Sequence, residues 1–206
     1  MHTTSAPEIT KDIAKVADAE FPTEFGQFRI YGFTREVEGR TEEAVVLKMG
    51  DLNEPEPPLV RIHSQCLTGD VFHSLRCDCR AQLEIALAAI AGEGRGLLIY
   101  EAQEGRGIGI MNKLRAYALQ DQGADTVEAN HRLGFDSDLR DYVLPAAILH
   151  YFGLRRVRLM SNNPEKVEAV EKVGVEVAER VPVLADVLDT RKAYLRTKRE
   201  KMGHLL

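Results

Sequence analysis

The stretch "GLLIYEAQEGRGIGIMNKLRAYALQDQG", residues 96–123, passes from an apolar run through a glycine-rich segment into a helical pattern. The run over 96–102 is short and apolar, which predicts a buried strand. Residues 110–123 have amphipathic spacing and close on a glycine, which predicts a helix that ends there. A strand, a tight turn and a helix in succession favour a fold that mixes strands with helices.

The same alternation continues toward the C-terminus. A helix is predicted over about 139–152 and a strand over 156–161. The Asn-Pro pair in "NNPEKVEAVEKVG", residues 162–174, is typical of a helix start, and "VEVAERVPV", residues 175–183, predicts a strand. The charged residues 187–206 are predicted to be helical.

The first third of the chain is mostly strand. Apolar or alternating patterns predict strands over 28–33, 44–49 and 59–65. The next segment, 81–94, has helical periodicity and ends on a glycine, so a helix is expected there.

Two segments lack a clear pattern. Residues 1–24 form a polar lead-in with a short helix expected near 13–19, and residues 124–138 are polar and irregular. No internal repeat and no linker is visible. We therefore predict an α+β (mixed α/β) single domain over 25–206, with mixed β-sheets flanked by helices, preceded by a polar N-terminal extension over 1–24.

Composition excludes several classes of protein. The formal net charge is −5, which argues against a general binder of nucleic acids. The N-terminus has no uninterrupted apolar stretch, and no run of about 18 apolar residues occurs, so neither a secretory signal nor a membrane span is expected. We expect a cytoplasmic protein, in which cysteines do not form a disulfide framework.

All three cysteines lie within fourteen positions, in "CLTGDVFHSLRCDC", residues 66–79. Thiolates at this density in a reducing compartment indicate zinc, which prefers sulfur at tetrahedral sites. A structural site would need a fourth ligand from the protein, for which His63 and His73 are candidates. A catalytic site would keep that position for water, as in enzymes that attack a purine or pyrimidine ring carbon. Spacing alone leaves both open, together with unliganded core cysteines.

Three segments are candidates for binding phosphate. The turn "QEGRGIG", residues 103–109, precedes a helix and carries Arg106, although the Lys and hydroxyl residue of a P-loop are missing. Arg61 lies on a predicted strand, where it is a phosphate ligand or an exposed strand residue. Ser161 and Lys166 flank a helix start that can equally be an ordinary capped helix. In "FDSDLRDY", residues 135–142, the acidic run is most simply a solvated loop.

Together these segments resemble GTP cyclohydrolase II, the enzyme that opens riboflavin biosynthesis. The resemblance covers about residues 25–206 and includes the closing "KMGHLL". The matching motifs occur in order: "VRIHSQCLTGDVFHSLRCDC", "GLLIYEAQEGRGIG", "NKLRAYALQDQGADTVEANHRLGF", "DLRDY", "SNNPEKV" and "ERVPV". The dihydroxybutanone-phosphate synthase domain that some relatives carry is not expected, which favours the monofunctional form.

The resemblance implies a reaction and its cofactors. GTP and water would give 2,5-diamino-6-(5-phospho-ribosylamino)pyrimidin-4(3H)-one, formate and pyrophosphate. The family uses one catalytic Zn²⁺ per chain, needs Mg²⁺ with the GTP phosphates, and is typically a homodimer. Its zinc ligands fall on Cys66, Cys77 and Cys79, with water in the fourth position. His63 and His73 would then not be ligands.

The resemblance also assigns catalytic residues. Tyr117 matches a tyrosine associated with hydrolysis of the ring, where the alternative is a core aromatic. Arg140 matches the residue proposed as nucleophile at the α-phosphorus. Because arginine is almost never neutral, stabilising charge on the phosphoryl group is an easier role for it. Asp138 matches the proposed proton acceptor and could instead orient Arg140.

Nucleotide contacts carry over by the same route. Glu104 is expected to accept hydrogen bonds from the guanine N1–H and 2-amino group, and the basic residues are expected at the triphosphate. The full set is Arg61, Ile62, His63, Ser64, Gln65, Gln82, Glu104, Gly105, Arg106, Thr126, Ser161 and Lys166. The alternative is a paralogue that stops at the formamide intermediate or at pyrophosphate release. A catalytically dead zinc protein and a zinc-ribbon module are disfavoured, because the expected residues are all present and paired Cys-x2-Cys knuckles are missing.

Overall fold

The computed structural model describes residues 12–136, 138–185, 203 and 205. These residues form two compact units that interleave along the chain. The sheet unit comprises Met1–His63, Glu84–Ala102 and Tyr142–Val183. The thiol unit comprises Ser64–Leu83, Gln103–Asp141 and Leu184–Leu206.

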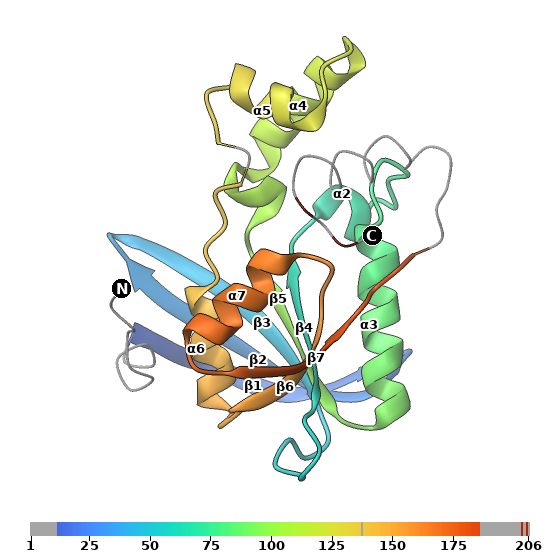
Figure 1. Ribbon diagram of the computed structural model, residues 1–206, viewed down its shortest axis with the longest axis vertical. Coiled ribbons are helices and arrows are strands. Elements are labelled where there is room, and N and C mark those ends of the chain that lie inside the picture. Colours follow the sequence, from blue (N-terminus) through green and yellow to red (C-terminus); the bar gives the residue numbers. More distant parts are fainter. Residues whose placement is uncertain (1–11, 137, 186–202, 204, 206) are drawn as a thin grey trace. The chain divides into compact units, whose positions relative to one another are not determined.

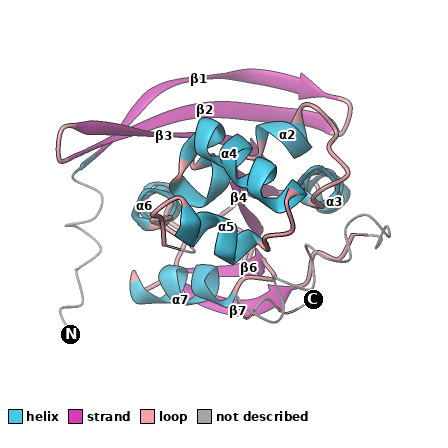
Figure 2. Cartoon of the chain, turned by 90° about the horizontal axis from the view of Figure 1, so that it is seen from above, coloured by secondary structure: helices cyan, strands magenta, loops and turns pink. Residues whose placement is uncertain are grey.

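The sheet has seven strands in the order β1-β2-β3-β5-β4-β6-β7 (Figure 1). Neighbours β1–β2, β2–β3 and β3–β5 are antiparallel, whereas β4–β6 and β6–β7 are parallel, with the two groups toward opposite ends of the sheet (Figure 2). The predicted mixed α/β class with a mixed sheet is confirmed. The strands are β1 (Ile13–Thr23), β2 (Gly26–Val37), β3 (Arg40–Met49), β4 (Leu59–Ser64), β5 (Gly96–Glu101), β6 (Arg156–Met160) and β7 (Glu176–Val181).

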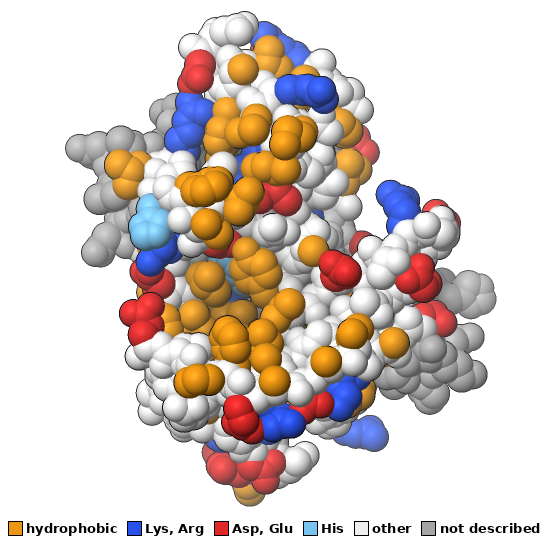
Figure 3. Space-filling model, turned by 180° about the vertical axis from the view of Figure 1, so that it is seen from behind, with side chains coloured by type: hydrophobic (Ala, Val, Ile, Leu, Met, Phe, Trp, Pro, Cys, Tyr) orange, Lys and Arg blue, Asp and Glu red, His pale blue; other side chains and the backbone are white. Residues whose placement is uncertain are grey.

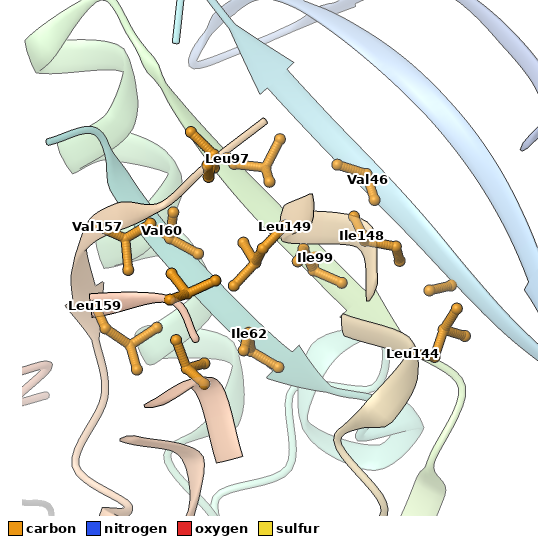
Figure 4. Close-up of a cluster of buried hydrophobic side chains, with 14 of the residues drawn as sticks. Val46, Val60, Ile62, Leu97, Ile99, Leu144, Ile148, Leu149, Val157 and Leu159 are labelled. Atoms are coloured by element: carbon orange, nitrogen blue, oxygen red, sulfur yellow. The ribbon is translucent and has the colours of Figure 1, made fainter. Parts of the chain in front are cut away.

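The core of the sheet unit forms between the sheet and its helices. Strands β3 to β6 present branched aliphatic side chains, and α6 (Val143–Tyr151) adds Leu144, Ile148 and Leu149 against them (Figure 4). Ile148 and Leu159 are fully buried. Burial of each such side chain contributes about 1.5–3 kcal/mol, so this cluster stabilises the sheet unit substantially.

Two further helices follow their sequence signals. The helix α7 (Pro164–Lys172) begins after Asn163, whose side chain accepts a hydrogen bond from the Glu165 amide at 3.0 Å. Proline in the first turn and asparagine at the cap confirm the predicted start. The helix α3 (Cys79–Glu93) begins two residues before the expected start at residue 81. Its first residues belong to the thiol unit and the rest to the sheet unit.

The described part of the thiol unit combines helices with loops. It contains α2 (Leu67–Asp70), the 3₁₀ helix η2 (Glu104–Gly107), α4 (Gly109–Asp121) and α5 (Thr126–Arg132). Its apolar cluster consists of three alanines, at 116, 124 and 129, with Leu119 and Leu133 against them. No helix in the described part of the chain combines the length and apolarity needed to cross a membrane.

Residues 13–23 form a strand, so the short helix expected near 13–19 is wrong. β1 pairs with β2 along its length, from Ile13 opposite Arg35 to Thr23 opposite Gly26. The local sequence contains good helix formers, but pairing with a neighbouring strand overrides that preference. The sheet therefore begins before residue 25, where we placed the start of the domain.

Two expectations about 124–152 are also wrong. Residues 126–132 form α5 because Asp125 caps it, accepting from the amides of Val127 at 2.9 Å and Glu128 at 3.1 Å. The following helix begins at Val143 and not near residue 139, because Asp141 is held in a loop by the Gln103 side chain. The helix expected over 187–206 lies almost wholly outside the described residues.

Candidate active site

The three cysteines meet in the thiol unit, although they come from different local structures. Cys66 follows β4 and caps α2, Cys77 lies in a loop, and Cys79 is the first residue of α3. Their sulfur atoms lie within 4.8 Å of one another, with Cys66 Sγ and Cys77 Sγ 3.7 Å apart. Within the described chain, no histidine belongs to this cluster. Three sulfurs at this spacing could bind one metal ion.

Gly69 lies directly against the sulfur atoms. A Cβ at this position would lie 2.7 Å from Cys77 Sγ and 3.1 Å from Cys66 Sγ, closer than real Cβ contacts. Any side chain here would therefore displace a thiol or the helix α2. The space beside the cysteines is kept by a glycine whose role is packing.

Lys113 of α4 joins the thiols to Glu104. Its Nζ donates to Cys66 Sγ at 3.1 Å and to Glu104 Oε1 at 2.7 Å. The other oxygen, Glu104 Oε2, accepts from the Leu67 amide at 2.6 Å, and Oε1 also accepts from the Gly105 amide at 2.9 Å. The carboxylate is thus fixed by three donors, and one cation contacts both anionic groups.

These contacts shift the proton affinities of the cluster. Hydrogen bonds from the thiols of Cys77 and Cys79, with help from Lys113, lower the pKa of Cys66 far below its ordinary value. The bond to Cys66 raises the pKa of Cys77 and of Cys79. Burial alone would lower the pKa of Lys113, but the Cys66 charge and Glu104 raise it overall. The Lys113 ammonium therefore favours negative charge on the Cys66 sulfur.

Tyr117 lies one helical turn after Lys113. Its hydroxyl is 3.3 Å from Thr68 Oγ1, and Thr68 Oγ1 is in turn 3.7 Å from Cys66 Sγ. Burial raises the pKa of Tyr117, which the Thr68 contact only partly offsets. The phenol is therefore protonated at neutral pH and able to donate a hydrogen bond.

Asp138 and Arg140 form an ion pair, as the alternative reading of the sequence allowed. Arg140 Nε donates to both Asp138 oxygens, at 2.9 and 3.1 Å, and Arg140 Nη1 donates to Ser64 Oγ at 3.3 Å. Burial alone would raise the pKa of Asp138, but Arg140 lowers it overall. The aspartate is ionised at neutral pH and orients the guanidinium.

The glycine-rich turn has an unusual backbone. Gly105 and Arg106 both have φ of +63°, a region that is rare for a residue with a Cβ such as arginine. The Arg106 carbonyl accepts a hydrogen bond from the Leu139 amide at 3.0 Å. The strained backbone fixes the position of Arg106 in the turn. Residues in such rare backbone conformations are common at functional sites.

The sheet unit holds the other basic residues of the predicted nucleotide set. Arg61 and Lys166 are both buried, and each donates to a backbone carbonyl: Arg61 to Met160 at 2.8 Å and Lys166 to Ile62 at 2.9 Å. Ser161, also buried, accepts from the Asn163 amide at 3.1 Å. His63 stacks on Tyr100, with ring centroids 5.5 Å apart. Within this unit the structure thus brings Arg61, Ile62, Ser161 and Lys166 into one connected group.

The remaining predicted residues belong to the thiol unit. Gln82 lies on α3 and donates to Asp78, Gln65 follows β4, and Thr126 is the first residue of α5. Sequence reasoning missed Lys113, Thr68 and Gly69. All three lie inside quoted motifs, but in the sequence Lys113 looks like any polar position of an amphipathic helix.

Comparison with known proteins decides the family. A sequence model described as GTP cyclohydrolase II matches residues 14–182. The chain belongs to the GTP cyclohydrolase II family. Relatives in this family include "GTP cyclohydrolase-2" of Shigella boydii serotype 18 (strain CDC 3083-94 / BS512), which is 53% identical over 94% of this chain and 98% of the relative. "GTP cyclohydrolase-2" of Pseudomonas putida (strain W619) is 54% identical over 93% of this chain and 92% of the relative.

Other relatives are longer than this chain. "Riboflavin biosynthesis protein RibBA" of Bacillus velezensis is 53% identical over 96% of this chain, but the match spans only 50% of that relative. Among solved structures, "RibBX, a two domain 3,4-dihydroxy-2-butanone 4-phosphate synthase from A. baumannii" has a TM-score of 0.50 and 21% identity, covering 88% of this chain and 43% of that one. At that identity the likeness concerns the fold alone.

Proposed function

We propose that this GTP cyclohydrolase II family member hydrolyses GTP to 2,5-diamino-6-(5-phospho-ribosylamino)pyrimidin-4(3H)-one, formate and pyrophosphate, the first step of riboflavin biosynthesis. The observation that carries the proposal is the thiol cluster of a family member with Glu104, Lys113 and Tyr117 around it in one unit. A bare structural zinc site would not need a buried carboxylate and a protonated phenol beside it.

The residues fit a zinc ion. Cys66, Cys77 and Cys79 supply three sulfurs within 4.8 Å, and Gly69 leaves their shared side free of a Cβ. Three protein ligands match a catalytic site, where a structural site would have four. Bound there, one zinc per chain would lower the pKa of a water toward neutrality and prepare it for attack on a ring carbon.

Glu104 is the proposed reader of guanine. Among the described residues, the carboxylate accepts from the amides of Leu67 and Gly105 and from Lys113. Guanine offers two donors on one edge, the N1–H and the 2-amino group, which a carboxylate held in this way could accept. Adenine presents no such pair of donors on that edge and would leave the carboxylate poorly matched.

The buried cations of the sheet unit suit an anionic ligand. Arg61 and Lys166 are buried in the same unit, where Arg61 donates to the Met160 carbonyl and Lys166 to the Ile62 carbonyl. Guanidinium and ammonium groups commonly bind phosphate, so these two side chains could bind the triphosphate with Mg²⁺. We propose Arg61, Ser161 and Lys166 for phosphate contacts within that unit, and Arg106 for the thiol unit.

Tyr117, Asp138 and Arg140 carry the proposed catalytic roles. Tyr117, protonated at neutral pH, would donate a hydrogen bond to the opening ring. Arg140, held by Asp138, would stabilise charge on the phosphoryl group from which pyrophosphate leaves. Asp138 is ionised and could also accept a proton. The homodimer implied by the resemblance and the cytoplasmic location expected from the sequence stay predictions.

The test is a product analysis of the purified protein with GTP and Mg²⁺. Formate and pyrophosphate in equal amounts, with the diaminopyrimidine, are expected. Tyr117→Phe should lower formate release by about 10²–10⁴-fold, the range typical of a lost acid–base group. Pyrophosphate without formate from zinc-containing protein would point to the paralogue. The absence of both products would contradict the proposal.

A further inference from the structure

Lys113 contacts both the metal-binding thiols and Glu104, the proposed reader of guanine. It lies on α4, and its side chain is 13% exposed. The ammonium contacts Cys66 Sγ at 3.1 Å and Glu104 Oε1 at 2.7 Å. Its neighbour Tyr117 presents its ring 5.8 Å from the same nitrogen. Lys113 lies inside the quoted motif "NKLRAYALQDQGADTVEANHRLGF", but the sequence alone gave it no role.

The charges explain why a cation belongs at this position. Three thiolates exceed the charge of a divalent ion by one, and Glu104 adds a second negative group at the same place. Without Lys113 these two anions would repel one another in a partly buried setting, where such interactions are stronger than in water. A compact ammonium with three donors can bond to both at once.

We propose that Lys113 is a positioning residue that couples the metal centre to the base-reading site. Toward the metal, its hydrogen bond to Cys66 Sγ draws electron density from that ligand and stabilises the thiolate. Toward the substrate, its bond to Glu104 aims the carboxylate. One side chain thereby sets the metal affinity and the recognition of the base. The substrate half rests on the proposed function, whereas the metal half does not.

The same helix provides a matched control. Arg115 lies two residues from Lys113, is exposed, and donates to Asn112 Oδ1 at 2.6 Å within α4. Arg115→Gln therefore removes one positive charge from the same helix without touching the thiols or Glu104. A change in zinc affinity shared by both variants would reflect net charge. A change confined to Lys113→Gln would reflect the lost contacts with Cys66 and Glu104.

The first measurement is zinc affinity by competition with a chelator, without nucleotide. Lys113→Gln is expected to bind zinc about 10–100-fold more weakly, the range typical for loss of a group that supports a metal ligand. Lys113→Arg should recover most of the loss because it keeps the charge, and Arg115→Gln should be unchanged. The thiolate-to-metal band of the Co²⁺-substituted protein should move to lower energy in Lys113→Gln only.

The second measurement is the steady-state rate with GTP. Lys113→Gln is expected to raise KM for GTP by a larger factor than it lowers kcat, because Glu104 loses its orientation. Turnover of GTP by the unsubstituted protein tests the proposed function by itself. A failure of that function can therefore be distinguished from a failure of the role proposed for Lys113. Zinc affinity within about twofold of the parent with an unmoved Co²⁺ band would overturn the proposal.

The neutral variants of Lys113 must be shown to fold before their zinc affinity is interpreted. Lys113→Met keeps the aliphatic length and is measured beside Lys113→Gln, with circular dichroism on each. If neither neutral variant folds even with zinc in excess, Lys113 is a structural residue and the proposal is overturned. A folded variant of either kind with weakened zinc binding, rescued by arginine, supports it.

Discussion

The two units of this chain are stabilised by different kinds of contact. The sheet unit has a continuous core of branched aliphatic side chains from β3 to β6 and from α6. The described part of the thiol unit has an apolar cluster of three alanines, and it leaves Phe72 70% and Met111 66% exposed. Hydrophobic side chains at the surface are also evident in Figure 3.

Polar contacts accompany the small apolar cluster in the described part of the thiol unit. Lys113 bonds to Cys66 and Glu104, Asp138 bonds to Arg140, and Asp125 caps α5. Each such bond contributes only about 0.5–1.5 kcal/mol net. A unit built this way gains more from a bound metal than one with a large core, since metal binding contributes directly to folding. The difference suggests that the sheet unit is the stable scaffold and the thiol unit the part that depends on its ligand.

Removal of zinc is the strongest test of that difference. Chelation, or Cys77→Ser, should abolish formate release and reduce hydrogen-exchange protection at least tenfold in α4 and α5. Amides of β3 and β5 should change little, because their bonds lie within the apolar core. Exchange read by mass spectrometry would show this. Equal loss of protection in both units would contradict the comparison.

Truncation in the sheet core should show the opposite pattern. Leu159→Ala, at a fully buried position, should lower the free energy of unfolding by about 2–5 kcal/mol in urea titrations. Zinc affinity of the folded variant should be unchanged. The control is Val16→Thr on β1, 64% exposed, with an expected change within about 0.5 kcal/mol. A loss of zinc in folded Leu159→Ala would mean that the units are not independent.

Sequence alone predicted the elements whose signal is local. The strands β3, β4 and β5 are short apolar or alternating runs, and α7 carries its cap and its proline, so each was found. β1 was missed because only pairing with β2 makes it a strand, and α5 was missed because its cap lies in a polar segment with no apolar stripe.

The residues of the candidate site also divide into those that the sequence predicted and those that only the folded structure revealed. The cysteines stand out by composition and spacing, and the resemblance supplied Glu104, Tyr117, Asp138 and Arg140. The role of Lys113 could not be predicted from the sequence. Its partners Cys66 and Glu104 are 47 and 9 residues away and contact it only in the folded chain. The strand order was not predictable either, since β5 lies between β3 and β4 in the sheet but follows both in the chain.

Adding a methyl group at two glycines compares a closed position with an open one. Gly69→Ala would place its Cβ 2.7 Å from Cys77 Sγ, so zinc affinity should fall by about tenfold or more. Gly92→Ala meets nothing within 4 Å inside α3 and should raise the free energy of unfolding by about 0.5–1 kcal/mol. Chelator competition and urea titration check the pair. Unchanged zinc binding in Gly69→Ala would show that α2 moves freely away from the thiols.

The smallest expected effect concerns the acid dependence of the thiol unit. Arg140 holds the pKa of Asp138 below its ordinary value of 3.8, against the effect of burial. A depressed carboxyl pKa stabilises the folded state above the unfolded-state value, and that contribution disappears as the pH falls through the lower folded-state pKa. Asp138→Asn should therefore cost on the order of 1 kcal/mol at neutral pH.

That cost should shrink below about pH 4, since the parent then loses the same charge. The matched control is Asp136→Asn, an exposed carboxylate of the same loop, which should follow the parent at every pH. Because release of the proposed zinc would also contribute at low pH in all three proteins, the informative quantity is the difference between variants in thermal unfolding at each pH. A constant difference between Asp138→Asn and the parent from neutral pH to pH 3 would show that the ion pair does not lower the pKa. In that case Asp138 would serve only to orient the Arg140 guanidinium.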